Sequence, residues 1–419
     1  MVLVRHLHRR SFAAARGHRN PSSWAVDNGE VRWERIRAGQ PISRDLVGAV
    51  LTRDLLVGGE RWSKGRRLSA EDLAALEREP AKARGMFGPE EQSAAPGAVP
   101  SPAGAGAHAH APSPPAETHG ERRIAEVTLL IPEPTDIHEN DAAVRLAAAL
   151  AGPGVTLRGP VESRIDLIAG HDGVLRVDVA GLERLNRIDP LSVFSAYDGQ
   201  VIAAGQVVAS VKVGPHLVAE HVIEAGEAVA RSRPHPIVDV RPFERRRVAA
   251  LVRETLGTAA RSRFEASVRA RVERLGSKLT EISYVPDDAD AIAERLDRLS
   301  AGSPGANIVL TAGAASTDPA DAVFVALERL GGRVVSHGVP AHPGSMLWLA
   351  RLRRTTIIGL PTCGAYSKAT AVDLLLPWLL SGDRPTRATV ARLGHGGLLT
   401  RDMRFRMPAY ARELEAPEG

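Results

Sequence analysis

The 419-residue chain contains a single cysteine, Cys363, and only 4% of its residues are aromatic. One cysteine excludes an internal disulfide and a thiolate metal cluster, as is usual in the reducing cytoplasm. So few aromatic side chains leave little surface on which nucleic-acid bases could stack, and the net charge is only +5. The composition therefore predicts a cytoplasmic protein that does not bind nucleic acid.

Long apolar runs are also missing. The longest, Ala371–Leu380, contains Asp373 and Pro377 and is well short of the roughly 20 residues that span a bilayer. We expect no membrane segment. The first 30 residues are basic and lack the apolar stretch of a secretory signal. They are interpreted as a disordered extension, with a targeting segment or a misassigned start codon as alternatives.

Composition and hydrophobic periodicity divide the rest of the chain. Ser69 and Asp72 form a helix capping box within the first unit. A segment dominated by Ala, Pro, Gly and Ser follows and cannot bury enough surface to fold. The predicted organisation is a basic extension (1–30), a small α+β unit (31–80), a disordered linker (81–122), a β-rich α+β domain (123–240), an α/β domain (241–385) and a C-terminal tail (386–419).

The α/β domain is predicted from the alternation of strand and helix patterns after Arg245. Arg246–Val252, Leu279–Asp288 and Asn307–Thr311 read as strands, separated by helical patterns. This order predicts parallel strands joined by right-handed crossovers, in a three-layer α/β/α sandwich with a mostly parallel sheet. Ligands of such sheets bind beyond the carboxyl ends of the strands.

An anion site is predicted after the strand Asn307–Thr311. The loop Ala312–Asp321 is rich in small residues, which let backbone N–H groups approach a phosphate, and a helical pattern opens near Pro319. Asp318 and Asp321 would repel a phosphate unless a cation such as Mg²⁺ lay between them. Ordinary helix capping is the alternative role for these two carboxylates.

This loop and three later segments resemble one family. The later segments are Gly338–Gly344, Ile357–Gly364 and Leu393–Leu398. In this order they resemble the molybdopterin-binding (MoaB/Mog/MoeA-like) domain of molybdenum insertases, molybdopterin adenylyltransferases and gephyrin. The resemblance covers about Arg241 to Leu399, implies a MogA-like fold, and is strongest to a divergent bacterial subgroup related to molybdopterin molybdenumtransferases.

The resemblance implies a role in molybdenum cofactor biosynthesis. The ligand would be molybdopterin or its adenylated form, and the reaction of the insertase branch is transfer of molybdate with loss of AMP, assisted by Mg²⁺. Asp321 would hold the metal and act in catalysis with Asp318, while His395 would supply a further donor. A homo-oligomer and a molybdenum hydroxylase apoenzyme partner are also implied. The implied cofactor-binding residues are Gly313, Ala314, Ser316, Thr317, His342, Pro343, Gly344, Pro361, Thr362, Cys363, Ser367 and Lys368.

Three departures from the family pattern leave catalysis open. Ala314 replaces a second glycine, and Thr362 with Cys363 stand where insertases commonly have Gly and Asn. The loop Arg253–Arg261 lacks the expected Thr-Gly and acidic pattern. A non-catalytic molybdopterin carrier for a molybdenum enzyme is therefore an alternative, as is a nucleotide hydrolase of the competence-damage type.

Overall fold

The computed structural model describes residues 32–79, 83–84, 123–124, 126–302, 305–313, 318–360 and 369–413. The described residues form two compact units. The first contains those up to Ala142 together with Val213–Glu224, and the second contains Ala143–Lys212 and the residues from Ala225 onward. The predicted basic extension and nearly all of the predicted linker lie outside the described residues.

The first unit has a small β-sheet and one well-capped helix. Strands β1 (Arg32–Arg37), β7 (Glu126–Ile131) and β2 (Val50–Leu51) pair in that order. Helix α1 (Ala70–Arg78) begins with the predicted capping box, in which Ser69 Oγ accepts from the Asp72 N–H at 3.1 Å and the Asp72 carboxylate accepts from the Ser69 N–H at 2.9 Å. The remaining elements are η1 (Arg44–Leu46), β3 (Leu55–Val57), β4 (Glu60–Trp62), β5 (Ala83–Arg84), β6 (Arg123–Ile124), β8 (Asp136–His138) and β15 (Leu217–Ala219).

One predicted boundary is moved by this sheet. The sequence assigned residues from 123 onward to the β-rich domain, but β7 pairs antiparallel with β1 along its whole length, from Arg32 opposite Ile131 to Arg37 opposite Glu126. Leu51 of β2, Leu73 of α1 and Leu129 of β7 are completely buried in one core. The small unit therefore takes its central strand from beyond the linker.

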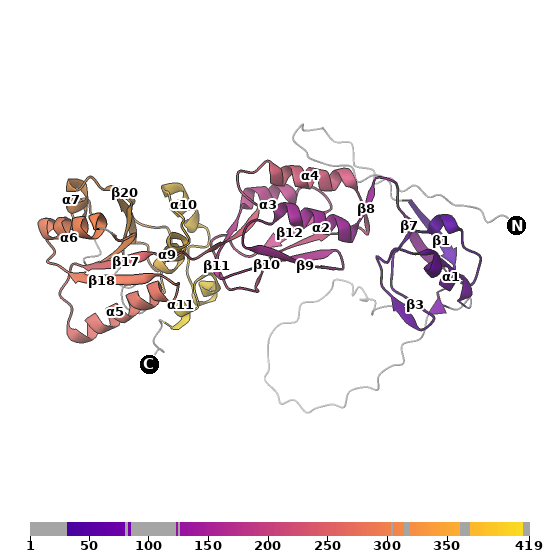
Figure 1. Ribbon diagram of the computed structural model, residues 1–419, viewed down its shortest axis with the longest axis horizontal. Coiled ribbons are helices and arrows are strands. Elements are labelled where there is room, and N and C mark those ends of the chain that lie inside the picture. The colour runs from indigo at the N-terminus through magenta and orange to yellow at the C-terminus, as the bar shows by residue number, and fades with distance from the viewer. Residues whose placement is uncertain are drawn as a thin grey trace, which may run out of the picture. The chain divides into compact units, whose positions relative to one another are not determined.

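The middle of the chain is β-rich with helices between, as predicted. Leu146 of α2 (Glu139–Leu150), Leu185 of α3 (Val179–Leu185) and Leu191 of β12 meet around Gly226 of α4 (Glu220–Arg231). Figure 1 shows α3 beside β12. One sheet contains β12 (Leu191–Ser195), β14 (Val207–Val213), β10 (Arg164–Ala169) and β9 (Val155–Val161), and another contains β13 (Val201–Ile202), β11 (Gly173–Val177) and β16 (Val238–Pro242).

The C-terminal domain is the predicted three-layer α/β/α sandwich. Its described residues form a six-stranded sheet of order β18-β17-β19-β22-β21-β20. The first four strands in that order are parallel, and β21 runs antiparallel to both of its neighbours. The strands are β17 (Arg247–Val252), β18 (Lys278–Tyr284), β19 (Ile308–Ala312), β20 (Arg333–Ser336), β21 (Trp348–Leu352) and β22 (Thr355–Gly359).

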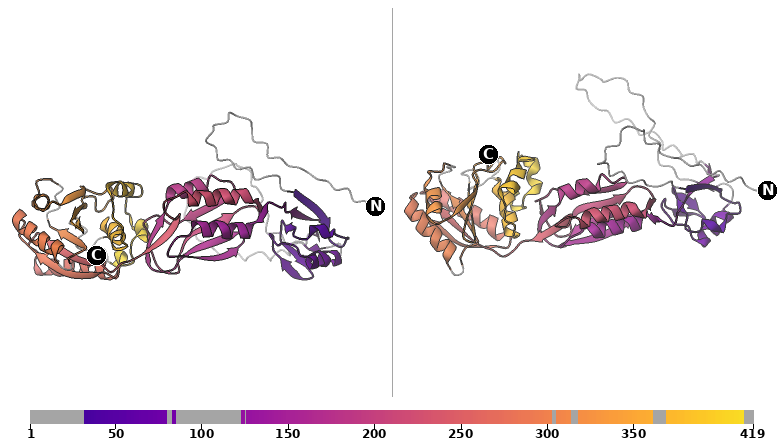
Figure 2. Two further views of the ribbon diagram at one scale, coloured as in Figure 1. Left: turned by 45° about the horizontal axis from the view of Figure 1, so that its top comes forward. Right: turned by 90° about the horizontal axis from the view of Figure 1, so that it is seen from above.

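Alternate residues of β17, which lies between β18 and β19, face different helical layers. Val248 and Ala250 of β17 pack in a core with α5 (Thr258–Glu273) and α9 (Val372–Leu380). Ala249 and Leu251 pack in a second core with α6 (Ala289–Ala301) and α7 (Ala322–Arg329). Figure 1 shows α6 and α7 on one side of the sheet and α5 on the other, and Figure 2 gives two further views of the domain. Burial on both faces explains the continuous apolar run of this strand.

Two details of the prediction are wrong. Helix α7 begins at Ala322, later than the predicted opening near Pro319, because Asp318 to Asp321 form a separate turn. The predicted tail from residue 386 is part of the domain, since Val390, Leu393, Leu399, Met407 and Tyr410 are buried in the same core as α5 and α9. That tail contains α10 (Arg387–Ala391), η2 (Arg392–Gly394), η3 (Arg401–Arg406) and α11 (Tyr410–Glu413).

Across the described ranges, no helix combines the length and the apolar character that crossing a membrane requires.

Candidate functional site

The order of the strands places a topological switch point beside β17. The chain passes from β17 through α5 to β18 on one side, and then through α6 to β19 on the other side of β17. The loops that follow β17 and β19 lead to α5 and α7, which cover opposite faces of the sheet. This is the switch point at which open α/β sheets bind ligands.

The register places a second predicted loop at the same edge. β21 runs antiparallel to β22, and its first residue, Trp348, lies opposite Gly359 at the carboxyl end of β22. The residues just before Trp348, including His342 to Gly344, therefore lie at the edge where β19 ends. Phe324 of α7 contacts both Trp348 and His337, with ring centroids 5.0 and 4.8 Å apart. This contact joins the helix after β19 to the neighbouring loop.

Arg253, the first residue after β17, connects three loops at this edge. Its Nη1 donates to Asp287 Oδ1 at 2.7 Å and to Asp321 Oδ1 at 2.8 Å, and its Nη2 donates to the Gly313 carbonyl at 2.9 Å. The Arg253 side chain is only 2% exposed. The sequence showed that this loop departs from the family, but it could not show which carboxylates the arginine would reach.

Asp321 is the N-cap of α7. Its Oδ1 accepts from the Val323 N–H at 3.0 Å as well as from Arg253, and its side chain is 6% exposed. Asp318 is exposed, and its Oδ1 accepts from the Ala320 N–H at 2.9 Å. Helix capping, the alternative left open by the sequence, is thus present for Asp321, while Asp318 accepts a hydrogen bond within the turn that precedes the helix. Their predicted catalytic and metal-binding roles stay predictions.

Gly313 has to be a glycine because of the backbone beside it. Its φ is +99°, and a Cβ atom there would lie 3.1 Å from the Arg253 carbonyl carbon and 3.2 Å from the Glu254 nitrogen. The loop after β19 can therefore pass directly over the loop after β17 only without a side chain at this position.

The segments around His342 and His395 lie side by side. The His342 N–H donates to the Gly397 carbonyl and the Leu399 N–H donates to the His342 carbonyl, each at 2.7 Å. His395 directly follows η2, at its C-cap position. Two segments that the resemblance linked are thus neighbours, although about 50 residues separate them in the sequence.

Pro343 and Gly344 lie against the start of α9. The Ala371 N–H donates to the Pro343 carbonyl at 3.0 Å, and a Cβ atom on Gly344, whose φ is +112°, would lie 2.7 Å from the Ala371 nitrogen. The remaining predicted site residues lie outside the described residues, and their roles stay predictions: Ala314, Ser316, Thr317, Pro361, Thr362, Cys363, Ser367 and Lys368.

A buried ion pair holds the start of α9. Arg271 of α5 and Asp373 of α9 are both 0% exposed, and Arg271 Nε donates to Asp373 Oδ1 at 3.0 Å. The other carboxylate oxygen accepts from the Thr370 N–H at 2.9 Å. Burial raises the pKa of the Tyr410 hydroxyl well above its ordinary value, with a further contribution from Asp373. The C-terminal tail is thus packed against the pair that positions α9.

The described residues contain no group of three or more His, Cys, Asp and Glu side chains placed to hold a metal ion.

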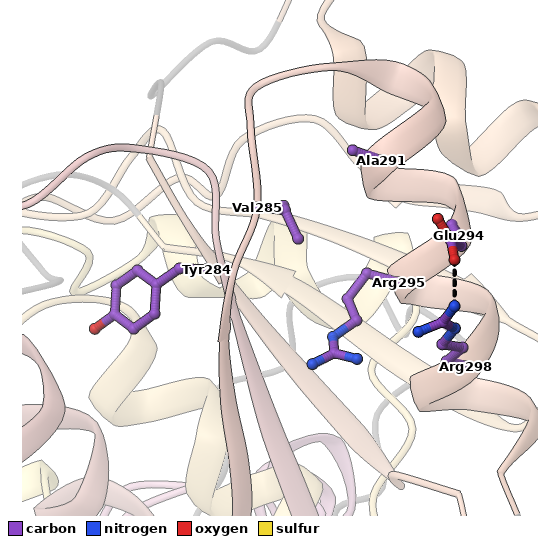
Figure 3. A pocket seen from close by; sticks show the side chains of 6 residues that line it. All are labelled: Tyr284, Val285, Ala291, Glu294, Arg295 and Arg298. Carbon is purple, nitrogen blue, oxygen red and sulfur yellow. Dashed lines mark hydrogen bonds and ion pairs between the residues drawn. The ribbon is translucent and has the colours of Figure 1, made fainter.

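A polar pocket of about 190 Å³ lies beside the end of β18 (Figure 3). Its Arg298 pairs with Glu294, and its Arg295 Nε donates to Ser283 Oγ at 2.8 Å. Burial raises the pKa of its Tyr284 to about 12. The pocket is smaller than the roughly 300 to 1,000 Å³ of typical ligand sites.

A larger cavity of about 570 Å³ lies at the opposite, amino-terminal edge of the sheet, between the end of α5 and residues 405–410. None of the predicted site residues that the structure describes lines either cavity. Among the predicted residues that are described, Gly313 and Asp321 contact Arg253. His342 contacts Gly397 and Leu399, while Pro343 and Gly344 lie against Ala371.

Comparison with known proteins finds similarities in the C-terminal domain. Residues 253–381 match the family model described as "Probable molybdopterin binding domain". A molybdopterin molybdenumtransferase of Synechococcus elongatus is 33% identical over 113 residues, which are 26% of this chain and 28% of that protein. The chain therefore spans less than a third of the curated relative that it matches.

Two solved structures are also similar. The molybdopterin biosynthesis enzyme MoaB of Thermus thermophilus has a TM-score of 0.24 and 18% identity, covering 33% of this chain and 98% of that one. The molybdopterin biosynthesis MoeA protein of Pyrococcus horikoshii has a TM-score of 0.25 and 13% identity, covering 62% of this chain and 81% of that one.

Proposed function

We propose that this chain binds molybdopterin and acts in molybdenum cofactor biosynthesis, on the premise that its residues 253–381 belong to the family of probable molybdopterin binding domains. The match begins at Arg253, the first residue after β17, and ends at Ser381, the C-cap of α9. It therefore covers the switch point and the loops beside it. The overlap between the matched residues and these loops is the observation that carries the proposal.

The ligand would lie at the carboxyl edge, above Gly313. There Asp321 begins helix α7, whose positive end favours an anion. The loop of Pro343 and Gly344 would close the other side, since the register brings it to the same edge. The proposed ligand is a pterin with a terminal phosphate, either free or adenylated, whose anion would face the start of α7.

The finer activity that we propose is transfer of molybdate to the bound pterin, as the name of the Synechococcus relative suggests. A second candidate is a carrier that delivers molybdopterin to a molybdenum enzyme. One observation favours the carrier: the Asp321 carboxylate, which the transferase reading would use for Mg²⁺, is already bound by Arg253 and by the Val323 N–H.

The binding test uses the purified full chain. After incubation with molybdopterin and removal of free ligand, the retained pterin is oxidised and its fluorescence measured. The wild type should retain pterin. Asp321→Asn keeps a cap of similar strength but removes the charge that orients Arg253, so it should retain less. The matched control is Asp297→Asn, which removes an exposed carboxylate of α6 paired with Arg353. No retention by the wild type would refute the proposal.

A separate experiment distinguishes the two activities. The gene is expressed in a strain that lacks its molybdenum insertase, and the activity of a molybdenum enzyme is measured. Restored activity supports the transferase. Pterin retention without restored activity supports the carrier.

A further inference from the structure

We infer that the Arg253 guanidinium takes the place of a divalent cation at the carboxyl edge, so that the phosphorylated ligand is bound there without Mg²⁺. The inference concerns the site of the proposed function and, for the ligand, rests on that function. It opposes the sequence prediction that Asp321 holds the metal.

The oxygens around Arg253 are of the kind that Mg²⁺ prefers. They are the Asp287 and Asp321 carboxylates and the Gly313 carbonyl, which lie 2.7, 2.8 and 2.9 Å from guanidinium nitrogens. Hard cations take carboxylate and carbonyl oxygens in this way. Here three loops supply the oxygens and an arginine supplies the positive charge.

The arrangement leaves Asp321 a poor fit for a metal ion. Its Oδ1 is shared by the guanidinium and the Val323 N–H, and the carboxylate is 6% exposed. A Mg²⁺ bound to this carboxylate would lie close to the Arg253 charge in a region with little water, where like charges repel strongly. Arg253 has little room to move aside, because its side chain is 2% exposed and its Nη2 is held by Gly313.

Arg253 also explains how a phosphate could approach two carboxylates without a metal. The guanidinium offsets the charge of the buried Asp321, while Asp287 is 44% exposed and solvated. By fixing Gly313 it also holds the start of the loop after β19. Because it is buried, Arg253 acts on the ligand through these groups, as a positioning residue.

Wild-type protein gives the first test. Ligand-free protein is titrated with Mn²⁺, a spectroscopic substitute for Mg²⁺, and bound ion is followed by electron paramagnetic resonance. We expect no Mn²⁺ binding that depends on Asp321, so the titrations of the wild type and of Asp321→Asn should agree. In parallel, molybdopterin retention is compared in EDTA and in Mg²⁺, and the two values should agree. Mn²⁺ binding that depends on Asp321, or loss of retention in EDTA, would overturn the inference.

The variant Arg253→Met gives the second test. It removes the charge and leaves the oxygens of Asp287, Asp321 and Gly313 without their cation, so the site should acquire Mn²⁺ binding. Its pterin retention should fall about tenfold in EDTA and recover in Mg²⁺. A folded Arg253→Met protein that binds no Mn²⁺, and whose pterin retention is the same in EDTA and in Mg²⁺, would count against the inference.

The matched control is Arg295→Met, because Arg295 also pairs with a carboxylate beside the sheet, that of Glu281, but is more exposed. It should behave as the wild type in every measurement. The two proposals fail differently: if no condition gives pterin retention, the proposed function fails, while the Mn²⁺ titration of ligand-free protein still decides the metal question. If Arg253→Met does not fold, the wild-type measurements decide it alone.

Discussion

Replacing Asp373 with asparagine should destabilise the C-terminal domain strongly. The substitution keeps the size and shape of the side chain, but it leaves the Arg271 guanidinium, which is 0% exposed, without its counter-charge. Removing one member of a buried ion pair costs about 3 to 5 kcal/mol. For a domain of this size we expect a lower melting temperature, by roughly 2 to 4 °C for each kcal/mol.

The expected destabilisation comes from the uncompensated charge of Arg271. A second variant separates this cause from simple loss of packing. The double variant Arg271→Met with Asp373→Leu replaces the pair by apolar side chains of similar volume. Such replacements are often neutral or stabilising by about 1 to 4 kcal/mol. The double variant should therefore be more stable than Asp373→Asn, although it carries more changes.

The assay is urea unfolding of the full chain, with hydrogen exchange of the α5 and α9 amides to report on this domain specifically. The single and double variants together form a thermodynamic cycle. Asp373→Asn should also reduce pterin retention, because loss of the ion pair destabilises the start of α9, where Ala371 contacts Pro343. An Asp373→Asn protein within about 1 kcal/mol of the wild type, a typical small mutational effect, or a double variant as unstable as the single one, would refute the reasoning.

Three further predictions follow from local contacts. Ser69→Ala removes one half of the capping box and should lower the stability of the first unit by about 1 kcal/mol, measured by urea unfolding. Gly344→Ala places a Cβ atom 2.7 Å from the Ala371 nitrogen at a φ of +112°; it should cost about 1 to 3 kcal/mol and reduce pterin retention. A hydrogen bond from Arg145 holds the pKa of Glu227 below its usual 4.5. That pairing stabilises the folded state above about pH 4.5 and is lost as the pH falls through the lowered pKa, so Glu227→Gln should lose less stability than the wild type between neutral and acidic pH, measured by melting temperature.

Much of the C-terminal domain could be predicted from the sequence because its signals are local. The strand β17 is apolar on both faces, Asp288 caps the helix that follows β18, and helix and strand alternate at short spacing. These features predict a parallel sheet between two helical layers. They also predict the edge at which a ligand would bind, since the carboxyl ends of parallel strands meet there.

The helix boundaries near the site were less predictable. A proline suits the first turn of a helix, which favoured a start near Pro319. In the structure Asp318 and Asp321 each accept from a nearby backbone N–H, and α7 begins only after the second. Either helix start would satisfy the local backbone hydrogen bonds. The observed start depends on Arg253, which lies 68 positions away and holds Asp321 in place.

The sequence by itself thus determined which segments are strands and helices, which loops share an edge, and which family the C-terminal domain resembles, because propensity, capping and motif spacing are properties of short stretches. Only the tertiary structure decided that β7 completes the first unit, that residues after 386 belong to the α/β core, and that Arg253 binds Asp321. Each of these is a contact between distant parts of the chain, and local sequence does not determine which distant segment is contacted. A buried charge needs an opposite charge beside it, but only the fold determines which one it meets.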